Sequence, residues 1–181
     1  MNGLESRIAQ AFSSPIGKNL LLNSNFLNPV NQREITTLGN SGYMMDRWYG
    51  SFQIDTESTV VLYPDGLSVT GGTAGLDPFV PPYVMQVFEK DNIWGALAGA
   101  SITFSALVTG TMTVELLDGW NTPISGASAT LTGGSSATVR TATFTLPSGL
   151  TRIGIKLSAA QSTSFTVQWV KLELGETNTQ Y

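Results

Sequence analysis

Strict alternation of apolar and polar residues in the second half of the chain constrains the fold more than any other sequence feature. Apolar side chains occupy every second position from 102 to 108, from 112 to 116 and from 153 to 157. A period of two places one set of side chains on one face of an extended strand. Strands with one buried face are typical of antiparallel sheets, and no helical spacing separates these runs. The sequence therefore predicts an all-β, antiparallel β-sandwich, and specifically a jelly roll.

Turn residues divide the chain into about eight to ten strands. Pro64-Asp65-Gly66 is a strong turn that predicts a hairpin between 59–63 and 67–70. Asp118-Gly119 predicts a second turn, and Thr132-Gly133-Gly134-Ser135 predicts a third between 130–131 and 138–146. Further strands are expected at 19–22, 43–48, 51–55 and 83–89.

The last predicted strand changes its apolar phase. Phe165, Val167 and Trp169 alternate, but Val170 follows Trp169 directly and Leu172 continues on the other parity. Either a β-bulge shifts the register here or both faces of the strand are covered. A neighbouring loop or a subunit contact would supply that cover.

Composition excludes several classes of function. The 181 residues include no cysteine and no histidine, which removes disulfides, thiolate chemistry, histidine metal ligands and Ser-His-Asp constellations. The net charge is −4 and no basic run is present, so nucleic-acid binding is not expected. No run of apolar residues reaches the roughly 20 needed to cross a membrane, so membrane insertion is not expected.

Residues 1–17 form a separate predicted segment ahead of a β-domain at 18–181. Leu4, Ile8, Ala11 and Phe12 share one face of a short helix that Pro15 ends. This helix is expected either to cap the domain's own core or to bundle with copies of itself or dock on a larger particle. The start of the chain lacks the basic and apolar regions of a secretory signal peptide.

Two motifs near the ends of the chain carry a family resemblance. The first is Asn19-Leu20-Leu21-Leu22-Asn23-Ser24-Asn25-Phe26, followed by Asp46-Arg47-Trp48, and the second is Lys171-Leu172-Glu173-Leu174-Gly175. Their order and spacing resemble the jelly-roll domains of bacteriophage tail fibres and related virion proteins, which in turn look like carbohydrate-binding modules. In that family an Asn-Gly turn often follows the first strand, and this chain has Ser24 instead.

These motifs have a structural interpretation, which we prefer to a sugar-binding one. Asp46 and Arg47 are expected to form charge-assisted hydrogen bonds that hold their loop near the last strand. Trp48 is expected to bury a large area. Glu173 is expected to pair with Arg47 or Lys171. Together, Asp46, Arg47, Trp48 and Glu173 are predicted to act as a clasp between the first and last strands.

Candidate chemistry lies in the loops. Aspartates in turns are expected to cap backbone groups rather than to form a glycosidase pair, so no catalytic residue and no cofactor are predicted. No clustered oxygen ligands for calcium appear, so no metal is predicted. Exposed aromatic side chains beside amides are typical of sugar sites, and the candidates are Phe79, Tyr83, Trp94, Trp120 and Asn121. The alternative is that these aromatic side chains fold back over the ends of the sandwich or are buried at subunit contacts.

The resemblance implies a non-enzymatic virion protein, assembled in the host cytoplasm. The first hypothesis is a homotrimeric tail-fibre or appendage module that contacts a host-surface glycan and other virion proteins. The second is a capsid decoration or head-fibre protein that binds and stabilises the shell. A third hypothesis, ranked below these, is a free-standing carbohydrate-binding module.

Overall fold

The computed structural model describes residues 19–53, 57–73, 79–88 and 97–179. Within these residues every extended element is a β-strand, and neighbouring strands in the sheets are antiparallel. The strands are β1 (Ser41–Met45), β2 (Trp48–Ser51), β3 (Thr59–Tyr63), β4 (Gly66–Thr70), β5 (Tyr83–Phe88), β6 (Ser101–Asp118), β7 (Thr122–Thr132), β8 (Thr138–Thr145), β9 (Ile153–Ser158) and β10 (Ser164–Leu174). The predicted helix, with Leu4, Ile8, Ala11 and Phe12, lies outside the described residues.

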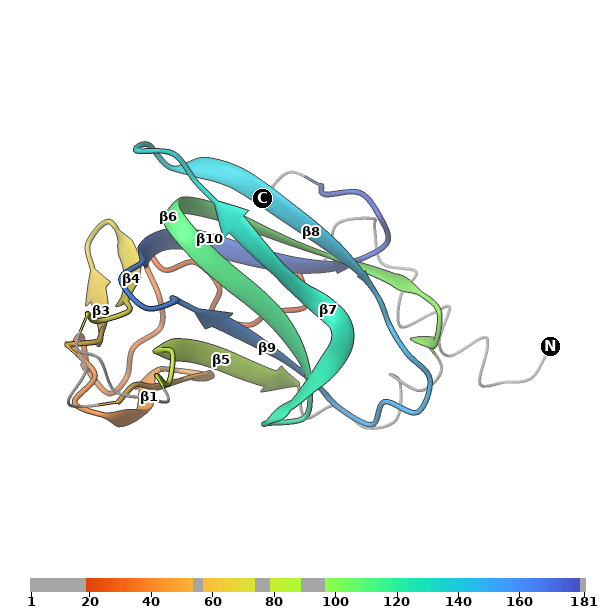
Figure 1. Cartoon of the computed structure of the whole chain (residues 1–181), viewed down its shortest axis with the longest axis horizontal. Helices are drawn as coiled ribbons and strands as arrows, with labels where there is room; N and C mark the ends of the chain where they lie inside the picture. Colours follow the sequence, from red (N-terminus) through yellow and green to blue (C-terminus); the bar gives the residue numbers. More distant parts are fainter. Residues whose placement is uncertain (1–18, 54–56, 74–78, 89–96, 180–181) are drawn as a thin grey trace.

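One long strand connects two layers of sheet. The first half of β6 pairs with β10 and β8, and β10 continues through β4 to β3; we call this the β10 layer. The second half of β6 pairs with β7 and β9, and β9 continues through β5 and β2 to β1; we call this the β9 layer. Figure 1 shows β8 and β10 in the upper part of the molecule and β5 and β9 in the lower part.

Gly110 allows β6 to pass from one layer to the other. The sequence pattern predicted two separate strands, 102–108 and 112–116, but the structure joins them into one. Gly110 has a φ of +74°, a value that disfavours residues with a Cβ. A Cβ at this position would also lie 2.1 Å from the carbonyl oxygen of Ser164. A glycine therefore continues the strand where the sequence pattern had indicated a break.

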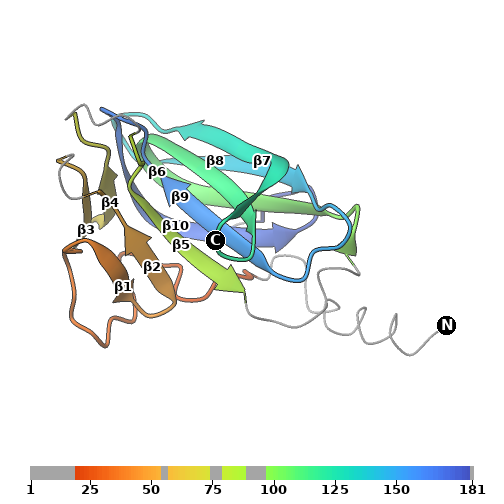
Figure 2. The ribbon, with the colours of Figure 1, turned by 60° about the horizontal axis from the view of Figure 1, so that its bottom comes forward.

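Apolar faces of the two layers meet in one core. Val114, Leu116, Ile155 and Leu157 from the β9 layer belong to the same buried cluster as side chains of the β10 layer, which include Phe104, Val108, Val167 and Leu172. These positions are the apolar members of the predicted alternation, so the alternation identified the core faces of β6, β9 and β10. Figure 2 shows the strands around this core from a second direction.

Several predicted strands differ from the observed ones. Residues 43–48 were predicted as one strand, but Asp46 and Arg47 form a turn that makes β1 and β2 a hairpin. The strand predicted at 51–55 is not found in its described part, because β2 ends at Ser51 and residues 52–53 are not in a strand; residues 54–55 lie outside the described residues. Residues 19–22 do not form a strand, since the chain bends at 21–23, although the Leu20 amide donates to the Leu172 carbonyl (2.8 Å).

The phase change in the last strand is a β-bulge. The register of β10 against β6 shifts between Val167 and Trp169. Beyond this point Val170 and Leu172 face the core, while Lys171 and Glu173 are buried on the opposite face. The bulge and the cover on both faces, which the sequence left as alternatives, therefore occur together.

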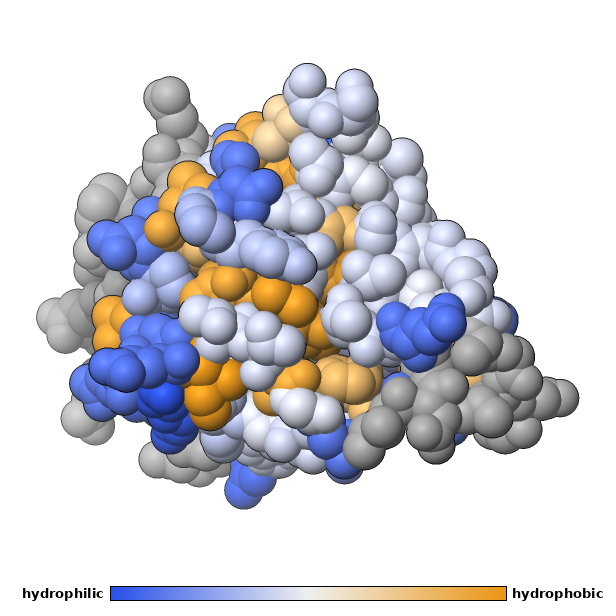
Figure 3. All heavy atoms as spheres, turned by 90° about the vertical axis from the view of Figure 1, so that its left-hand side faces the viewer, coloured by the Kyte–Doolittle hydropathy of each residue, from blue (hydrophilic) through white to orange (hydrophobic). Residues whose placement is uncertain are grey.

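The long loop before β1 carries three exposed apolar side chains. Leu27, Val30 and Ile35 all lie in this loop, and a bridge between Thr37 and Val61 holds its end beside β3. Figure 3 views the molecule from the side where β1 and β3 lie in Figure 1, and hydrophobic groups there are interspersed with hydrophilic ones.

Candidate functional site

Trp48 ties the segment before β1 to the core. Its side chain is fully buried and packs edge-on against Phe26, with ring centroids 5.2 Å apart. Its indole Nε1–H donates to the carbonyl oxygens of Leu22 (3.2 Å) and Asn23 (3.0 Å). The structure thus places Trp48 where it satisfies two backbone carbonyls of the bent segment 19–26.

Two amide side chains form hydrogen bonds with backbone groups near residues 19–22, where a strand had been predicted. Asn19 donates from Nδ2 to the Val170 carbonyl (3.0 Å) and accepts at Oδ1 from the Leu172 amide (3.0 Å). Gln86 pairs with Leu22 in the same two-way manner, accepting from its amide (2.9 Å) and donating to its carbonyl (2.8 Å). These side chains mimic a backbone ladder and join the first segment to β10 and β5.

Among the charged members of the predicted clasp, Glu173 has one of its two expected partners, whereas Asp46 pairs with a residue that was not predicted. Asp46 pairs with Arg33 at 3.1 Å. Arg47 is exposed in the β1–β2 turn with a φ of +74°. Glu173 pairs with Lys171 (3.2 Å), and both are almost completely buried. Two partners were predicted for Glu173, Arg47 and Lys171, and among the described residues its ion pair is with Lys171.

Thr179 closes over that buried ion pair. Its hydroxyl donates to Glu173 Oε1 (2.6 Å) and accepts from Lys171 Nζ (2.5 Å), and its backbone amide donates to Glu173 Oε2 (3.1 Å). Lys171 also donates to the Thr179 carbonyl (3.2 Å). The charges are therefore hydrogen-bonded on the face of β10 that the core does not cover.

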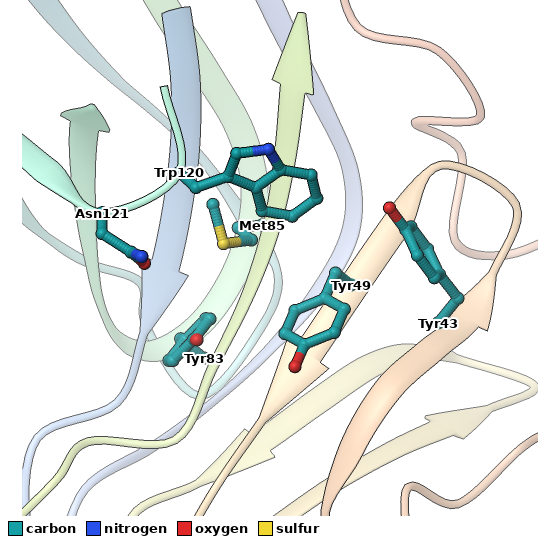
Figure 4. Close-up of a pocket in the computed structure, with 6 residues that line it drawn as sticks. All are labelled: Tyr43, Tyr49, Tyr83, Met85, Trp120 and Asn121. Atoms are coloured by element: carbon teal, nitrogen blue, oxygen red, sulfur yellow. The ribbon is translucent and has the colours of Figure 1, made fainter. Parts of the chain in front are cut away.

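A pocket of about 470 Å³ opens on the face of the β9 layer that is turned away from the core. Figure 4 shows its lining: four aromatic side chains, a thioether and an amide, from Tyr43, Tyr49, Tyr83, Met85, Trp120 and Asn121. Met85 is only 2% exposed, although it does not belong to the core cluster. Its side chain is therefore covered by neighbours on the outer face of the sheet.

Strand register assembles one wall of the pocket. Tyr43 of β1 is the direct cross-strand partner of Tyr49 of β2, which in turn is the partner of Met85 of β5. Tyr83 lies two residues before Met85 and so shares its face. Cross-strand partners project from the same face, so three neighbouring strands present these side chains together.

The opposite wall is the loop between β6 and β7. Trp120 and Asn121 follow Gly119 in this loop, and Trp120 is 36% exposed. The rings of Tyr49 and Trp120 are perpendicular, with centroids 6.1 Å apart, and Tyr43 and Tyr49 are perpendicular at 5.6 Å. Figure 4 shows Trp120 on the loop side of the pocket and Tyr43 and Tyr49 on the hairpin side.

Two cations lie against the tyrosines. The Arg33 guanidinium carbon is 5.4 Å from the Tyr43 ring centroid, and Lys156 Nζ is 5.9 Å from that of Tyr83. Lys156 is also paired with the carboxylate of Glu115 on β6. Burial raises the pKa of the Tyr83 phenol; a hydrogen bond with Ser51 offsets part of this effect, and Tyr49 adds slightly to it.

The structure brings together three of the five residues predicted for a sugar site. Tyr83, Trp120 and Asn121 line the pocket, whereas Phe79 is half-buried and is not among the lining residues. Trp94 lies outside the described residues. Tyr43 and Tyr49 were not predicted, because 43–48 was treated as one strand, and Met85 was not predicted although it shares a strand face with Tyr83. A hairpin turn at Asp46-Arg47 would have placed Tyr43 opposite Tyr49.

The described residues also bear on metal binding and membrane insertion. No group of three or more Asp or Glu side chains gathers there as a metal site would require. Within the same residues, no helix is long and apolar enough to cross a membrane.

Comparison with known proteins defines the class of fold. No family model and no curated protein matches the chain. A putative sugar-binding protein from Bacteroides thetaiotaomicron VPI-5482 superposes with a TM-score of 0.58 at 11% identity, over 87% of this chain and 100% of that one. A CBM4 structure gives 0.56 at 14% identity over 85% and 99%, and the apo structure of BiXyn10A CBM1 gives 0.51 at 10% over 80% and 98%. The chain therefore has the β-sandwich fold of carbohydrate-binding modules.

Proposed function

We propose that this protein is a non-catalytic glycan-binding module whose ligand occupies the pocket lined by Tyr43, Tyr49, Tyr83, Met85, Trp120 and Asn121. The observation that carries the proposal is the perpendicular pair of Tyr49 and Trp120 at 6.1 Å beside an open hollow. Aromatic rings set at an angle give two apolar surfaces to one sugar ring. The phenol groups and the Asn121 amide supply hydrogen bonds at its edge. Sugars need both, because each pyranose has apolar C–H faces and a rim of hydroxyls.

The composition of the pocket favours binding over catalysis. Glycoside hydrolysis uses two carboxyl groups across the scissile bond. None of the six lining residues carries a carboxylate. The similarity in fold to carbohydrate-binding modules supports the same proposal, since concave pockets with few polar groups are the usual ligand sites of such scaffolds.

A glycan array followed by calorimetry tests this proposal. The wild-type chain should bind at least one glycan class on the array, and Trp120→Ala and Tyr49→Ala should each weaken that binding by about tenfold or more. Tyr63→Ala is the matched control, because Tyr63 is exposed on β3, away from the pocket. An array with no bound glycan, or equal affinity in all variants, would contradict the proposal.

Whether this protein binds glycans as part of a virion or as a free-standing module is a separate prediction. Of the three hypotheses drawn from the sequence, the free-standing carbohydrate-binding module agrees best with the structural comparisons. A tail-fibre, capsid-decoration or homotrimeric role rests on the motifs at the two ends of the chain. Imaging of virions carrying the labelled protein would test the virion hypotheses, and light scattering would test the trimer.

A further inference from the structure

An ion pair flanks the proposed site on each side. At the hairpin side, Arg33 lies against Tyr43 and is paired with Asp46 at 3.1 Å. At the β9 side, Lys156 lies against Tyr83 and is paired with Glu115. Both tyrosines line the pocket. Each cation that contacts a tyrosine of the pocket is thus already neutralised by a carboxylate.

Strand register holds the Lys156–Glu115 pair beside the pocket. Lys156 of β9 is the direct cross-strand partner of Met85, which lines the pocket, and also the partner of Glu115 on β6. The two side chains are only 28% and 19% exposed. The pair is therefore a fixed part of the same row of residues as Tyr43, Tyr49 and Met85.

A charged ligand would meet an unfavourable field at this site. A sugar carboxylate that approached Lys156 would compete with Glu115 for the ammonium group and would be repelled by that carboxylate. Asp46 has the same effect at Arg33. The net charge of −4 adds to the repulsion at low ionic strength. A neutral sugar does not meet this repulsion, because its hydroxyls need hydrogen bonds and not a free counter-charge.

From this geometry we propose that Glu115 is a specificity-determining residue that helps to restrict the pocket to uncharged glycans and to exclude uronate and sialate sugars. The inference rests on the proposed glycan-binding function and adds the class of ligand. Exclusion through a repulsive group is a common source of specificity, because a binding site discriminates by the difference between two affinities.

The test compares acidic sugars with their uncharged methyl esters and with neutral sugars. An array is printed with oligogalacturonate, oligoglucuronate and sialyl oligosaccharides as free acids and as methyl esters, together with neutral gluco-, xylo-, manno- and galacto-oligosaccharides. The wild-type chain should bind neutral members only. Glu115→Gln frees the charge of Lys156 and should raise affinity for acid probes by up to about fivefold, an effect that weakens as salt is added.

Two further variants keep the result interpretable. Glu176→Gln changes the net charge equally, but Glu176 is exposed and bonds to Ser101 at the start of β6, so it should leave acid binding unchanged. Lys156→Gln combined with Glu115→Gln should abolish the gain. Wild-type preference for acids over their esters, or no gain in Glu115→Gln, overturns this inference and leaves glycan binding standing. Absence of any bound glycan overturns the proposed function and the inference with it.

Discussion

A Cβ on Gly154 would lie 2.4 Å from the carbonyl oxygen of Gly119. Gly154 is on β9 between Val87 and Leu117, its cross-strand partners. Gly119 precedes Trp120 in the β6–β7 loop. Backbone of the loop therefore occupies the space where a side chain of β9 would stand, and this contact holds Trp120 over the outer face of the sheet.

Gly154→Ala should disrupt the pocket and leave the sheets intact. The added methyl group must push the loop away, since the atom it meets belongs to the backbone and cannot rotate aside. We expect a destabilisation of about 1–3 kcal/mol in chemical denaturation, with loss of the nuclear Overhauser contact between Trp120 and Tyr49. Gly39→Ala is the control, because a Cβ there meets nothing within 4 Å. An unchanged Trp120–Tyr49 contact in Gly154→Ala would show that the loop is held by other means.

Replacing Asn19 should loosen the first segment from β10. Its side chain amide bonds to both Val170 and Leu172, so Asn19→Ala leaves a carbonyl and an amide of a central strand without these partners. The expected loss is about 1–3 kcal/mol in the free energy of unfolding. Asn19→Asp should also lose stability, because a carboxylate keeps the bond from the Leu172 amide but places an oxygen against the Val170 carbonyl in place of a donor. Equal stability of all three chains in urea would contradict this role.

Lys171 and Glu173 should behave as a coupled pair. Lys171→Met leaves the Glu173 carboxylate buried beside Thr179 without its cation, and Glu173→Leu leaves the ammonium group in the same position. Each single change is expected to cost about 3–5 kcal/mol, whereas the double variant should cost less than the sum. Denaturation of the four chains in a double-mutant cycle gives the coupling energy. Additive losses would mean that the two charges act independently.

Alkaline pH should lower the stability of the folded chain through ionisation of Tyr83. Because burial raises the pKa of Tyr83 above its ordinary value of 10.0, the folded chain holds this proton more tightly than the unfolded chain does. Its contribution to stability is complete below pH 10 and is lost as pH rises through the folded pKa. Spectrophotometric titration should show a late-ionising phenol that disappears in Tyr83→Phe. Tyr63→Phe, at an exposed position, should leave that late phase in place.

The strands of the second half were predictable because their signal is local. Alternation at Ile153, Ile155 and Leu157 reflects only which face of a strand is buried, and β9 forms where that pattern lies. The β3–β4 hairpin was predictable for a similar reason, since Pro64-Asp65-Gly66 favours a turn in any context. Trp120 was correctly placed at a loop tip by the preceding Asp118-Gly119.

The β1–β2 hairpin gave no such local signal. Its turn contains Arg47 at a φ of +74°, a conformation usually taken by glycine or asparagine. In addition, a bulge at Met44 allows the adjacent residues Met44 and Met45 both to be buried. The strand therefore lacks the regular alternation of apolar and polar residues. Sequence reasoning therefore saw one strand and did not place Tyr43 opposite Tyr49.

The amino-acid sequence alone determined the all-β class, the core faces of the long strands and the burial potential of Trp48. These properties depend on spacing within a single segment. Only the tertiary structure decided which aromatic side chains share a pocket. The β1–β2 hairpin with Tyr43 and Tyr49, the strand with Met85 and the loop with Trp120 are separate segments of the chain. They meet because strand register and the close contact of Gly119 with Gly154 bring those segments together. Register between strands that no short turn connects depends on how the buried faces of both strands pack, so the spacing within one strand does not determine it.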